Sequence, residues 1–226
     1  MRAADIPEYV QDGAVDCGIT GLDLVRERGA RVGELARLGF GSCRLEAAVP
    51  GESEAASLAD LQGATVATVY PRLARELLPV DVELVDVTGS VELAPRLGLA
   101  DAIVDLVSSG NTLRTNGLRS LGTLLESEAV LIGGDGAEAG PFASMLRAVV
   151  EGRRHRYVML NVPESRLPRI TELVRPRVPS VLPLAEPGLV AVHVLVPSAD
   201  VWRLLPELEA AGGSSILVVP VERMAA

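Results

Sequence analysis

The sequence predicts an α/β protein that ends in a ferredoxin-like domain. Over the first 150 residues, short apolar runs alternate with helical segments, a pattern typical of parallel strands joined by crossover helices. The last 74 residues follow the order βαββαβ, which is the ferredoxin-like order. The charge changes at the same place, since residues 1–152 hold 23 acids and 12 arginines and residues 153–226 hold 7 acids and 9 arginines. A domain junction is therefore expected near residue 152.

The elements of the first part can be placed in order. Apolar runs predict strands at residues 15–19, 44–49, 65–68, 82–87, 102–107 and 128–132. Helical periodicity predicts helices at residues 21–28, 56–61, 71–78, 91–98 and 142–151. The glycine-rich segment 133–140 is expected to be a flexible connection that leads back between the two halves of this core.

The C-terminal part predicts one compact unit. Its expected elements are a strand at 157–163, a helix at 164–174, strands at 180–185 and 188–197, a helix at 198–212 and a strand at 214–222. Ser198 is the expected N-cap of the second helix. Trp202 lies among leucines on that helix, which favours a place in the core or at a subunit interface.

Composition excludes several classes of protein. With 48% hydrophobic residues the chain can bury a large core, yet it has neither a membrane-spanning apolar run nor a signal peptide, so we expect a globular cytoplasmic protein. The net charge of −9 disfavours nucleic-acid binding. All 21 basic residues are arginines, which excludes a Walker-type lysine and Schiff-base chemistry and leaves anions to arginine and backbone N–H groups.

The metal-binding and reactive residue types are isolated. Cys17 and Cys43 each stand in apolar surroundings, which favours two reduced structural thiols. His155 and His193 have no cysteine or histidine at ligand spacing, so the sequence gives no support to a zinc site.

The segment 101–119, DAIVDLVSSGNTLRTNGLR, carries the clearest chemical signal. A buried strand is followed by a loop rich in hydroxyl groups with Gly110 at its centre, where backbone N–H groups and side chains can surround a phosphate. Asp105, three residues before the loop, can accept hydrogen bonds from sugar hydroxyls or help place Mg²⁺. Together they suggest a ligand with both ribose and phosphate. The alternative is an ordinary strand-to-helix turn, which uses the same residue types.

Residues 87–118 closely resemble the signature region of the ATP phosphoribosyltransferase family. Three further segments resemble that family in the same order, namely 16–25 (DCGITGLDLV), 38–45 (LGFGSCRL) and 66–74 (VATVYPRLA). The resemblance covers nearly the whole chain. It implies a two-lobed core like that of periplasmic binding proteins, followed by the regulatory domain of the long, histidine-inhibited form. The implied boundaries are residues 1–43 and 133–152 for the first lobe, 44–132 for the second and 153–226 for the regulatory domain.

The resemblance also implies an activity. Family members join N1 of the adenine of ATP to C1 of phosphoribosyl pyrophosphate with Mg²⁺ present, which releases pyrophosphate and opens histidine biosynthesis. Such a reaction can rest on positioning and charge stabilisation without a covalent nucleophile. The implied phosphoribosyl pyrophosphate site comprises Asp105, Ser108, Ser109, Gly110, Asn111, Thr112 and Leu113. The implied catalytic residues are Glu92, near the pyrophosphate or metal end, and Asp105, which would hold the ribose hydroxyls.

Three other residues match positions that line the family's nucleotide pocket: Asp23, Leu24 and Tyr70. For Tyr70 the alternative is a partly buried tyrosine at a strand end, and for Glu92 it is a solvent-facing helix residue. Histidine is expected to bind at an interface between copies of the C-terminal domain, with Ser180 and Ser215 at strand starts as candidate contacts. Turn and cap roles for these serines are equally compatible with the sequence. The expected assembly is a homo-oligomer, either a dimer or a hexamer.

The chain departs from the family pattern at its start. Family members carry a strand, a loop of the Lys-Gly-Arg kind, a helix and further strands before the segment that matches residues 2–16, whereas here Met1 directly precedes that segment. We interpret this as truncation of the first lobe and expect the 226-residue chain to be impaired. The rival hypothesis is a non-catalytic two-lobed protein that binds a small ligand or serves as a regulatory subunit.

Overall fold

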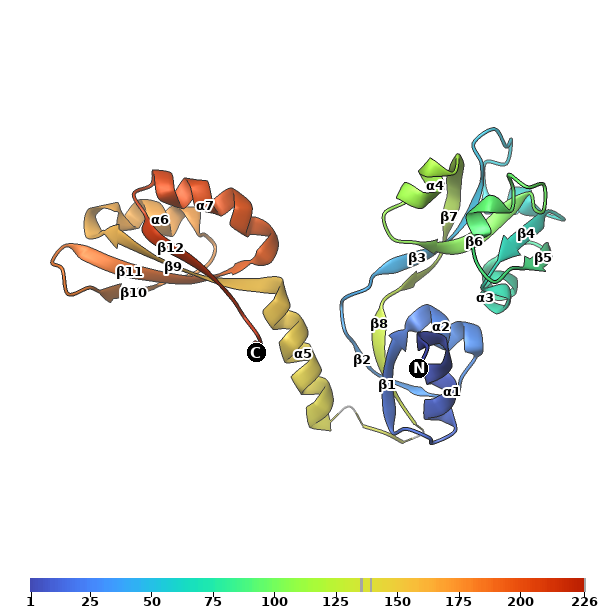
Figure 1. Cartoon of the computed structure of the whole chain (residues 1–226), viewed down its shortest axis with the longest axis horizontal. Coiled ribbons are helices and arrows are strands. Elements are labelled where there is room, and N and C mark those ends of the chain that lie inside the picture. Colours follow the sequence, from blue (N-terminus) through green and yellow to red (C-terminus); the bar gives the residue numbers. More distant parts are fainter. Residues whose placement is uncertain (135, 139, 226) are drawn as a thin grey trace. The chain divides into compact units, whose positions relative to one another are not determined.

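The computed structural model describes residues 1–134, 136–138 and 140–225 (Figure 1). It divides into two compact units, residues 1–139 and 140–226. Helix α5 (Gly140–Arg154) therefore groups with the C-terminal unit, ahead of the junction expected near residue 152. Within the described residues, no helix is both long enough and apolar enough to cross a membrane.

A small antiparallel sheet forms one half of the first unit. Its order is β1-β8-β2, and the central strand β8 (Ala129–Gly133) runs antiparallel to β1 (Cys17–Gly21) and β2 (Gly33–Arg37). The 3₁₀ turn η1 (Ala3–Asp5) and helices α1 (Ile6–Gln11) and α2 (Leu22–Arg28) accompany this sheet. Strand β2 escaped prediction because GELAR is short and buries only one side chain well.

A larger mixed sheet forms the other half, in the order β5-β4-β6-β3-β7. Strand β4 (Thr65–Thr68) is parallel to β5 (Glu83–Asp86) and β6 (Ala102–Val107). Strand β3 (Cys43–Pro50) is antiparallel to β6 and to β7 (Leu118–Ser127). The expected parallel arrangement thus holds for β4, β5 and β6 and is wrong for the rest.

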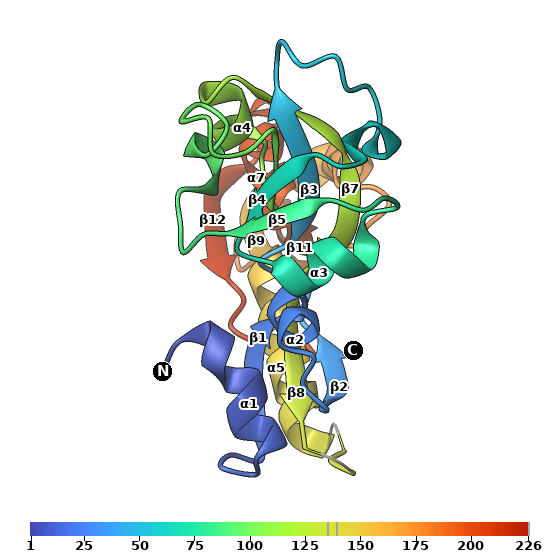
Figure 2. The same cartoon turned by 90° about the vertical axis from the view of Figure 1, so that its right-hand side faces the viewer.

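Strands β3 and β7 are antiparallel to their neighbours and are joined directly to strands of the smaller sheet. β2 leads into β3, and β7 leads into β8 across Glu128 alone, so the chain passes twice between the halves (Figure 2). A parallel neighbour requires a crossover connection, usually a helix, and neither of these two passages contains one. Strand β7 was not predicted, since LRSLGTLLES lacks regular alternation and its pairing with β3 contains two register shifts.

Short helical elements cover the larger sheet: η2 (Leu58–Leu61), α3 (Pro71–Leu77), η3 (Val91–Leu93) and α4 (Asn111–Thr115). The helix expected at 91–98 is reduced to one 3₁₀ turn, since Pro95 follows and Gly98 adopts a φ of 70°. Alternate residues of β3, β4 and β6 enter two separate cores, one on each face of the sheet. The rigid sheet thereby fixes the loops at its ends.

The C-terminal unit confirms the ferredoxin-like prediction. After α5 come β9 (His155–Pro163), η4 (Glu164–Arg166), α6 (Leu167–Leu173), β10 (Ser180–Pro183), β11 (Leu189–Pro197), η5 (Ser198–Asp200), α7 (Val201–Ala210) and β12 (Ser214–Pro220). The sheet order is β10-β11-β9-β12, and every neighbouring pair is antiparallel. Alternate valines and leucines of β9 and β11 pack against α6 and α7.

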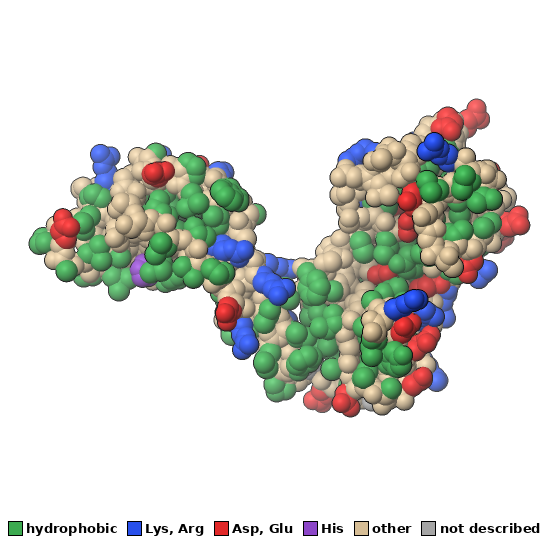
Figure 3. All heavy atoms as spheres, viewed as in Figure 1, with side chains coloured by type: hydrophobic (Ala, Val, Ile, Leu, Met, Phe, Trp, Pro, Cys, Tyr) green, Lys and Arg blue, Asp and Glu red, His purple; other side chains and the backbone are tan. Residues whose placement is uncertain are grey.

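Two side-chain expectations for this unit need correction. Ser198 donates its hydroxyl to the carbonyl of Arg153, and α7 begins only at Val201, so Ser198 is not its N-cap. Trp202 is 84% exposed, so the core alternative is wrong, whereas a place at a subunit interface stays a prediction. Hydrophobic side chains also lie on the surface of this unit (Figure 3).

Candidate functional site

The loop after β6 lies at the carboxyl edge of the parallel strands, where ligands bind in open α/β sheets. Gly110 adopts a φ of 73°, which a residue with a Cβ avoids, and turns the chain into α4. Ser108, Ser109, Asn111 and Thr112 are exposed. Leu113 is buried in the core below, so it can offer a ligand only its backbone.

A cavity of about 70 Å³ brings the two predicted catalytic carboxylates to this loop. It is lined by Glu92, Asp105, Leu106, Val107, Ser108, Ser109, Gly110, Thr112 and Leu113. Both Glu92 and Asp105 are half-buried. The structure therefore brings together a residue of η3, a residue of β6 and the loop that follows β6, and Glu92 is half-buried rather than fully exposed.

Asp105 has an unusual environment. Burial, followed by the nearby charge of Glu92, raises the pKa of its carboxyl, while the Leu106 N–H that it accepts at 2.8 Å acts in the opposite direction. The ionised carboxylate of Asp105 is stabilised by any group that donates hydroxyl hydrogen bonds to it or carries a positive charge. Ribose hydroxyls and a divalent cation both meet that requirement.

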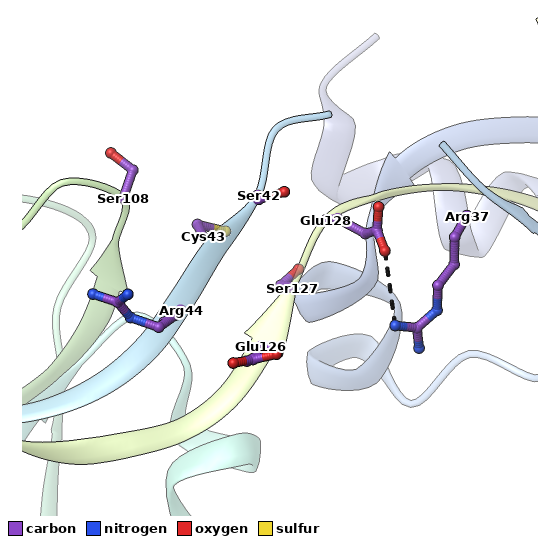
Figure 4. Close-up of a pocket in the computed structure, with 8 residues that line it drawn as sticks. All are labelled: Arg37, Ser42, Cys43, Arg44, Ser108, Glu126, Ser127 and Glu128. Carbon is purple, nitrogen blue, oxygen red and sulfur yellow. Dashed lines mark ion pairs between the residues drawn. The ribbon is translucent and has the colours of Figure 1, made fainter. Parts of the chain in front are cut away.

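A second cavity of about 320 Å³ shares Ser108 with the first. Figure 4 shows its lining, which comes from the strands that connect the two sheets: Arg37, Ser42, Cys43, Arg44, Ser108, Glu126, Ser127 and Glu128. None of these except Ser108 was a predicted site residue. The available signal was the absence of lysine, which leaves only arginine side chains to bind anions through a full charge.

Asp23 and Tyr70, both predicted for the nucleotide pocket, meet in a buried network that also includes Ser127. The Tyr70 hydroxyl donates to Oδ2 of Asp23 at 3.0 Å, and the Ser127 hydroxyl donates to Oδ1 at 2.6 Å. The Asp23 N–H returns a bond to Ser127 Oγ at 3.0 Å. The two side chains are 4% and 7% exposed, and burial with the charge of Asp23 raises the Tyr70 pKa well above its ordinary value.

This network belongs to a wider contact between α2 of the small sheet and α3 of the large one. Glu27 accepts the backbone N–H groups of Arg72 and Leu73 at 3.0 and 2.9 Å, and Arg26 pairs with Glu76 at 2.6 Å. Carboxylate and backbone bonds of this kind replace capping by a local side chain. The two halves of the first unit are therefore held together by polar groups.

Leu24, the third residue predicted for the nucleotide pocket, and Cys43 lie beside this contact. Leu24 is partly buried against the core of the larger sheet. Cys17 and Cys43 are free thiols, as expected, and burial followed by the charge of Asp23 raises the pKa of Cys43. Among the described residues, no group of three or more His, Cys, Asp or Glu side chains is arranged to hold a metal ion.

The two serines proposed for histidine lie apart. Ser215 has a φ of 49° at the irregular start of β12 and lines a cavity of about 420 Å³ with Trp202 and Glu209. Ser180 starts β10, at the opposite edge of the same sheet. One copy of the domain does not bring these serines together.

Comparison with known proteins identifies the family. The family model described as ATP phosphoribosyltransferase matches residues 2–149, and the model of the C-terminal domain of the same family, HisG, matches residues 152–223. The chain is 45% identical to the ATP phosphoribosyltransferase of Halobacterium salinarum and 43% identical to that of Methanopyrus kandleri, covering 99% of this chain and 82% of each relative.

A solved structure agrees with this result. The ATP phosphoribosyl transferase (HisG:HisZ) complex from Thermotoga maritima matches with a TM-score of 0.53 and 26% identity, over 59% of this chain and 66% of that one. The matches do not favour the rival hypothesis of a non-catalytic two-lobed protein that binds a small ligand or serves as a regulatory subunit. The chain belongs to the ATP phosphoribosyltransferase family, in its long form with a C-terminal domain.

Proposed function

We propose that the chain carries out the reaction of its family, in which ATP and phosphoribosyl pyrophosphate give phosphoribosyl-ATP and pyrophosphate, the first step of histidine biosynthesis. One observation supports this assignment above the others. The loop of residues 108–113, Asp105 and Glu92 line one cavity at the carboxyl edge of a parallel sheet. Few ligands other than a phosphorylated sugar need both oxyanion donors and carboxylate acceptors within such a small volume.

Each part of the cavity has a role in this proposal. The exposed hydroxyls and backbone N–H groups of residues 108–113 bind the 5′-phosphate. Asp105 accepts hydrogen bonds from the ribose hydroxyls, which orients C1 toward the incoming adenine. Since the reaction needs no covalent nucleophile, this positioning and the stabilisation of the departing pyrophosphate account for the catalysis.

The carboxylates also fit a Mg²⁺ ion. Mg²⁺ is commonly held by one or two carboxylates together with substrate phosphates, and Glu92 and Asp105 supply that number. When bound, the ion would offset the negative charge of the substrate phosphates. Burial first, and the charge of Glu92 to a smaller extent, raise the pKa of Asp105, and a nearby cation would favour its ionised form.

We assign the nucleotide side of the reaction to Asp23, Leu24 and Tyr70. Because Asp23 and Tyr70 bond to one another and are buried, ATP must either exchange that bond for its own contacts or meet only the edges of these residues. We further propose that histidine binds between copies of the C-terminal domain in a homo-oligomer, so that Ser180 of one copy approaches Ser215 of another. The protein would act in the cytoplasm.

A pair of glycines offers a matched test of the loop. Gly110 and Gly117 have φ values of 73° and 68°, and neither has a close neighbour that a new Cβ would strike. Alanine at either position costs about 1 kcal/mol of backbone strain, but only Gly110 lies in the cavity. Gly110→Ala combined with Thr112→Ala should abolish thermal stabilisation by phosphoribosyl pyrophosphate, while Gly117→Ala retains it. Equal stabilisation of all variants would reject the site.

A further inference from the structure

Arg44 stands beside the phosphate loop with part of its guanidinium uncommitted. Arg44 pairs with Val107 between β3 and β6, and Val107 directly precedes Ser108 in the chain. Arg44 and Ser108 both line the larger cavity. Its Nε donates to Oε1 of Glu46 at 2.6 Å. Glu46 is 5% exposed, whereas the Arg44 side chain is 47% exposed. A buried carboxylate therefore fixes the base of the guanidinium and leaves its terminal nitrogens facing the cavity.

The other arginine of the same cavity is differently engaged. Arg37 binds Glu34 through Nε at 3.0 Å and approaches Glu128 through Nη1 at 3.8 Å. Both of its partners are carboxylates, and Figure 4 shows it beyond β7, on the far side of the cavity from Ser108. Arg44 is thus the arginine placed to meet a ligand that extends from the loop.

Among the described residues, the small cavity offers no cationic side chain to balance the negative charge of the ligand's pyrophosphate. Its charged lining consists of Glu92 and Asp105, without an arginine. Phosphoribosyl pyrophosphate carries a phosphate at C5 of the ribose and a pyrophosphate at C1, and the pyrophosphate holds the larger negative charge. With the 5′-phosphate in a cavity of about 70 Å³, the rest of the ligand must extend past Ser108 toward the cavity of about 320 Å³.

We propose that Arg44 binds the pyrophosphate group of phosphoribosyl pyrophosphate and that Glu46 acts as a positioning residue for it. This inference rests on the proposed function. A guanidinium held at one nitrogen presents its remaining N–H groups in a plane that matches two phosphate oxygens. When the bond between C1 and the pyrophosphate oxygen breaks, the electron pair leaves with pyrophosphate, and Arg44 stabilises the charge that develops there.

Four variants of the full chain separate this role from a structural one. Arg44→Gln removes the charge, and Arg44→Lys keeps a charge without the planar fork. Glu46→Gln keeps Arg44 but loosens its attachment, and Arg37→Gln is the matched control in the same cavity. Thermal stabilisation is titrated with phosphoribosyl pyrophosphate, with inorganic pyrophosphate and with ATP, each in the presence of Mg²⁺. Melting without ligand reports on the fold of each variant.

The expected result is selective. Arg44→Gln should weaken binding of phosphoribosyl pyrophosphate and of pyrophosphate about tenfold or more, leaving ATP unchanged. Arg44→Lys and Glu46→Gln should show smaller losses, and Arg37→Gln none. Unchanged pyrophosphate binding by Arg44→Gln, or a loss confined to ATP, overturns the assignment while the proposed function stands. If Arg44→Gln fails to fold, the comparison of Arg44→Lys with Arg37→Gln decides. Failure of the unaltered chain to bind either phosphorylated ligand overturns both.

Discussion

Removing the Tyr70 hydroxyl tests the contact between the two halves of the first unit. Tyr70→Phe keeps the ring in the core but deprives Asp23 Oδ2 of a donor that lies 3.0 Å away in a site only 4% exposed. A hydrogen bond to a charged group contributes about 1.5–3 kcal/mol, and a buried acceptor left without its donor loses the full amount. For a unit of this size, that loss corresponds to a fall in Tm of about 4–10 °C.

The measurement is thermal and urea unfolding followed by far-ultraviolet circular dichroism. Tyr9→Phe is the control, because Tyr9 is 42% exposed and such surface substitutions change stability by less than about 0.5 kcal/mol. The bond from Ser127 to Oδ1 should persist in the variant, so Asp23 keeps one donor and the unit still folds. Equal stability of Tyr70→Phe and Tyr9→Phe would refute the claim that this hydroxyl joins the halves.

Three further expectations concern single positions. Because burial raises the folded-state pKa of Asp105, its ionised form opposes folding above that pKa, so Asp105→Asn should stabilise the unit at neutral pH; in urea unfolding at several pH values, the gain should vanish as pH falls toward the ordinary aspartate range. Leu208→Ala should cost about 2–5 kcal/mol because Leu208 is fully buried; Trp202→Ala, at 84% exposure, should cost almost nothing, and equal losses would contradict the burial pattern. Gly29→Ala and Gly13→Ala should each cost about 1 kcal/mol in the same assay, since both positions have positive φ and the Arg72 guanidinium near Gly29 belongs to an exposed side chain that can move; a much larger loss at Gly29 would contradict this.

The sequence predicted the C-terminal unit almost completely because its signals are local. Alternating apolar residues in β9 and β11 and the short connections between elements each point to one arrangement. The loop at residues 108–113 was visible for the same reason, since glycine and hydroxyl residues directly follow an apolar strand. The meeting of Glu92 with Asp105 came from the family resemblance, because η3 is brought to β6 only by the tertiary fold.

Other features depend on long-range pairing that periodicity cannot reveal. Strands β2 and β7 are edge strands of their sheets, with few buried side chains and irregular registers, so their local patterns are weak. Arg44 looked like any strand arginine until Glu46 and Ser108 were seen around it. The capping of α3 by Glu27 joins positions 45 and 46 residues apart, and nothing near either position announces it.

The bonds from Glu27 to the first turn of α3 couple the order of that helix to the separation of the two halves of the first unit. If the two halves separate, the N–H groups of Arg72 and Leu73 lose the carboxylate of Glu27 and must turn to water at the moment when Tyr70 is uncovered. Opening and fraying of the first turn of α3 then become a single event. Amide hydrogen exchange at these two positions would consequently report how often the proposed nucleotide site is accessible, and a ligand that closes the halves should slow this exchange.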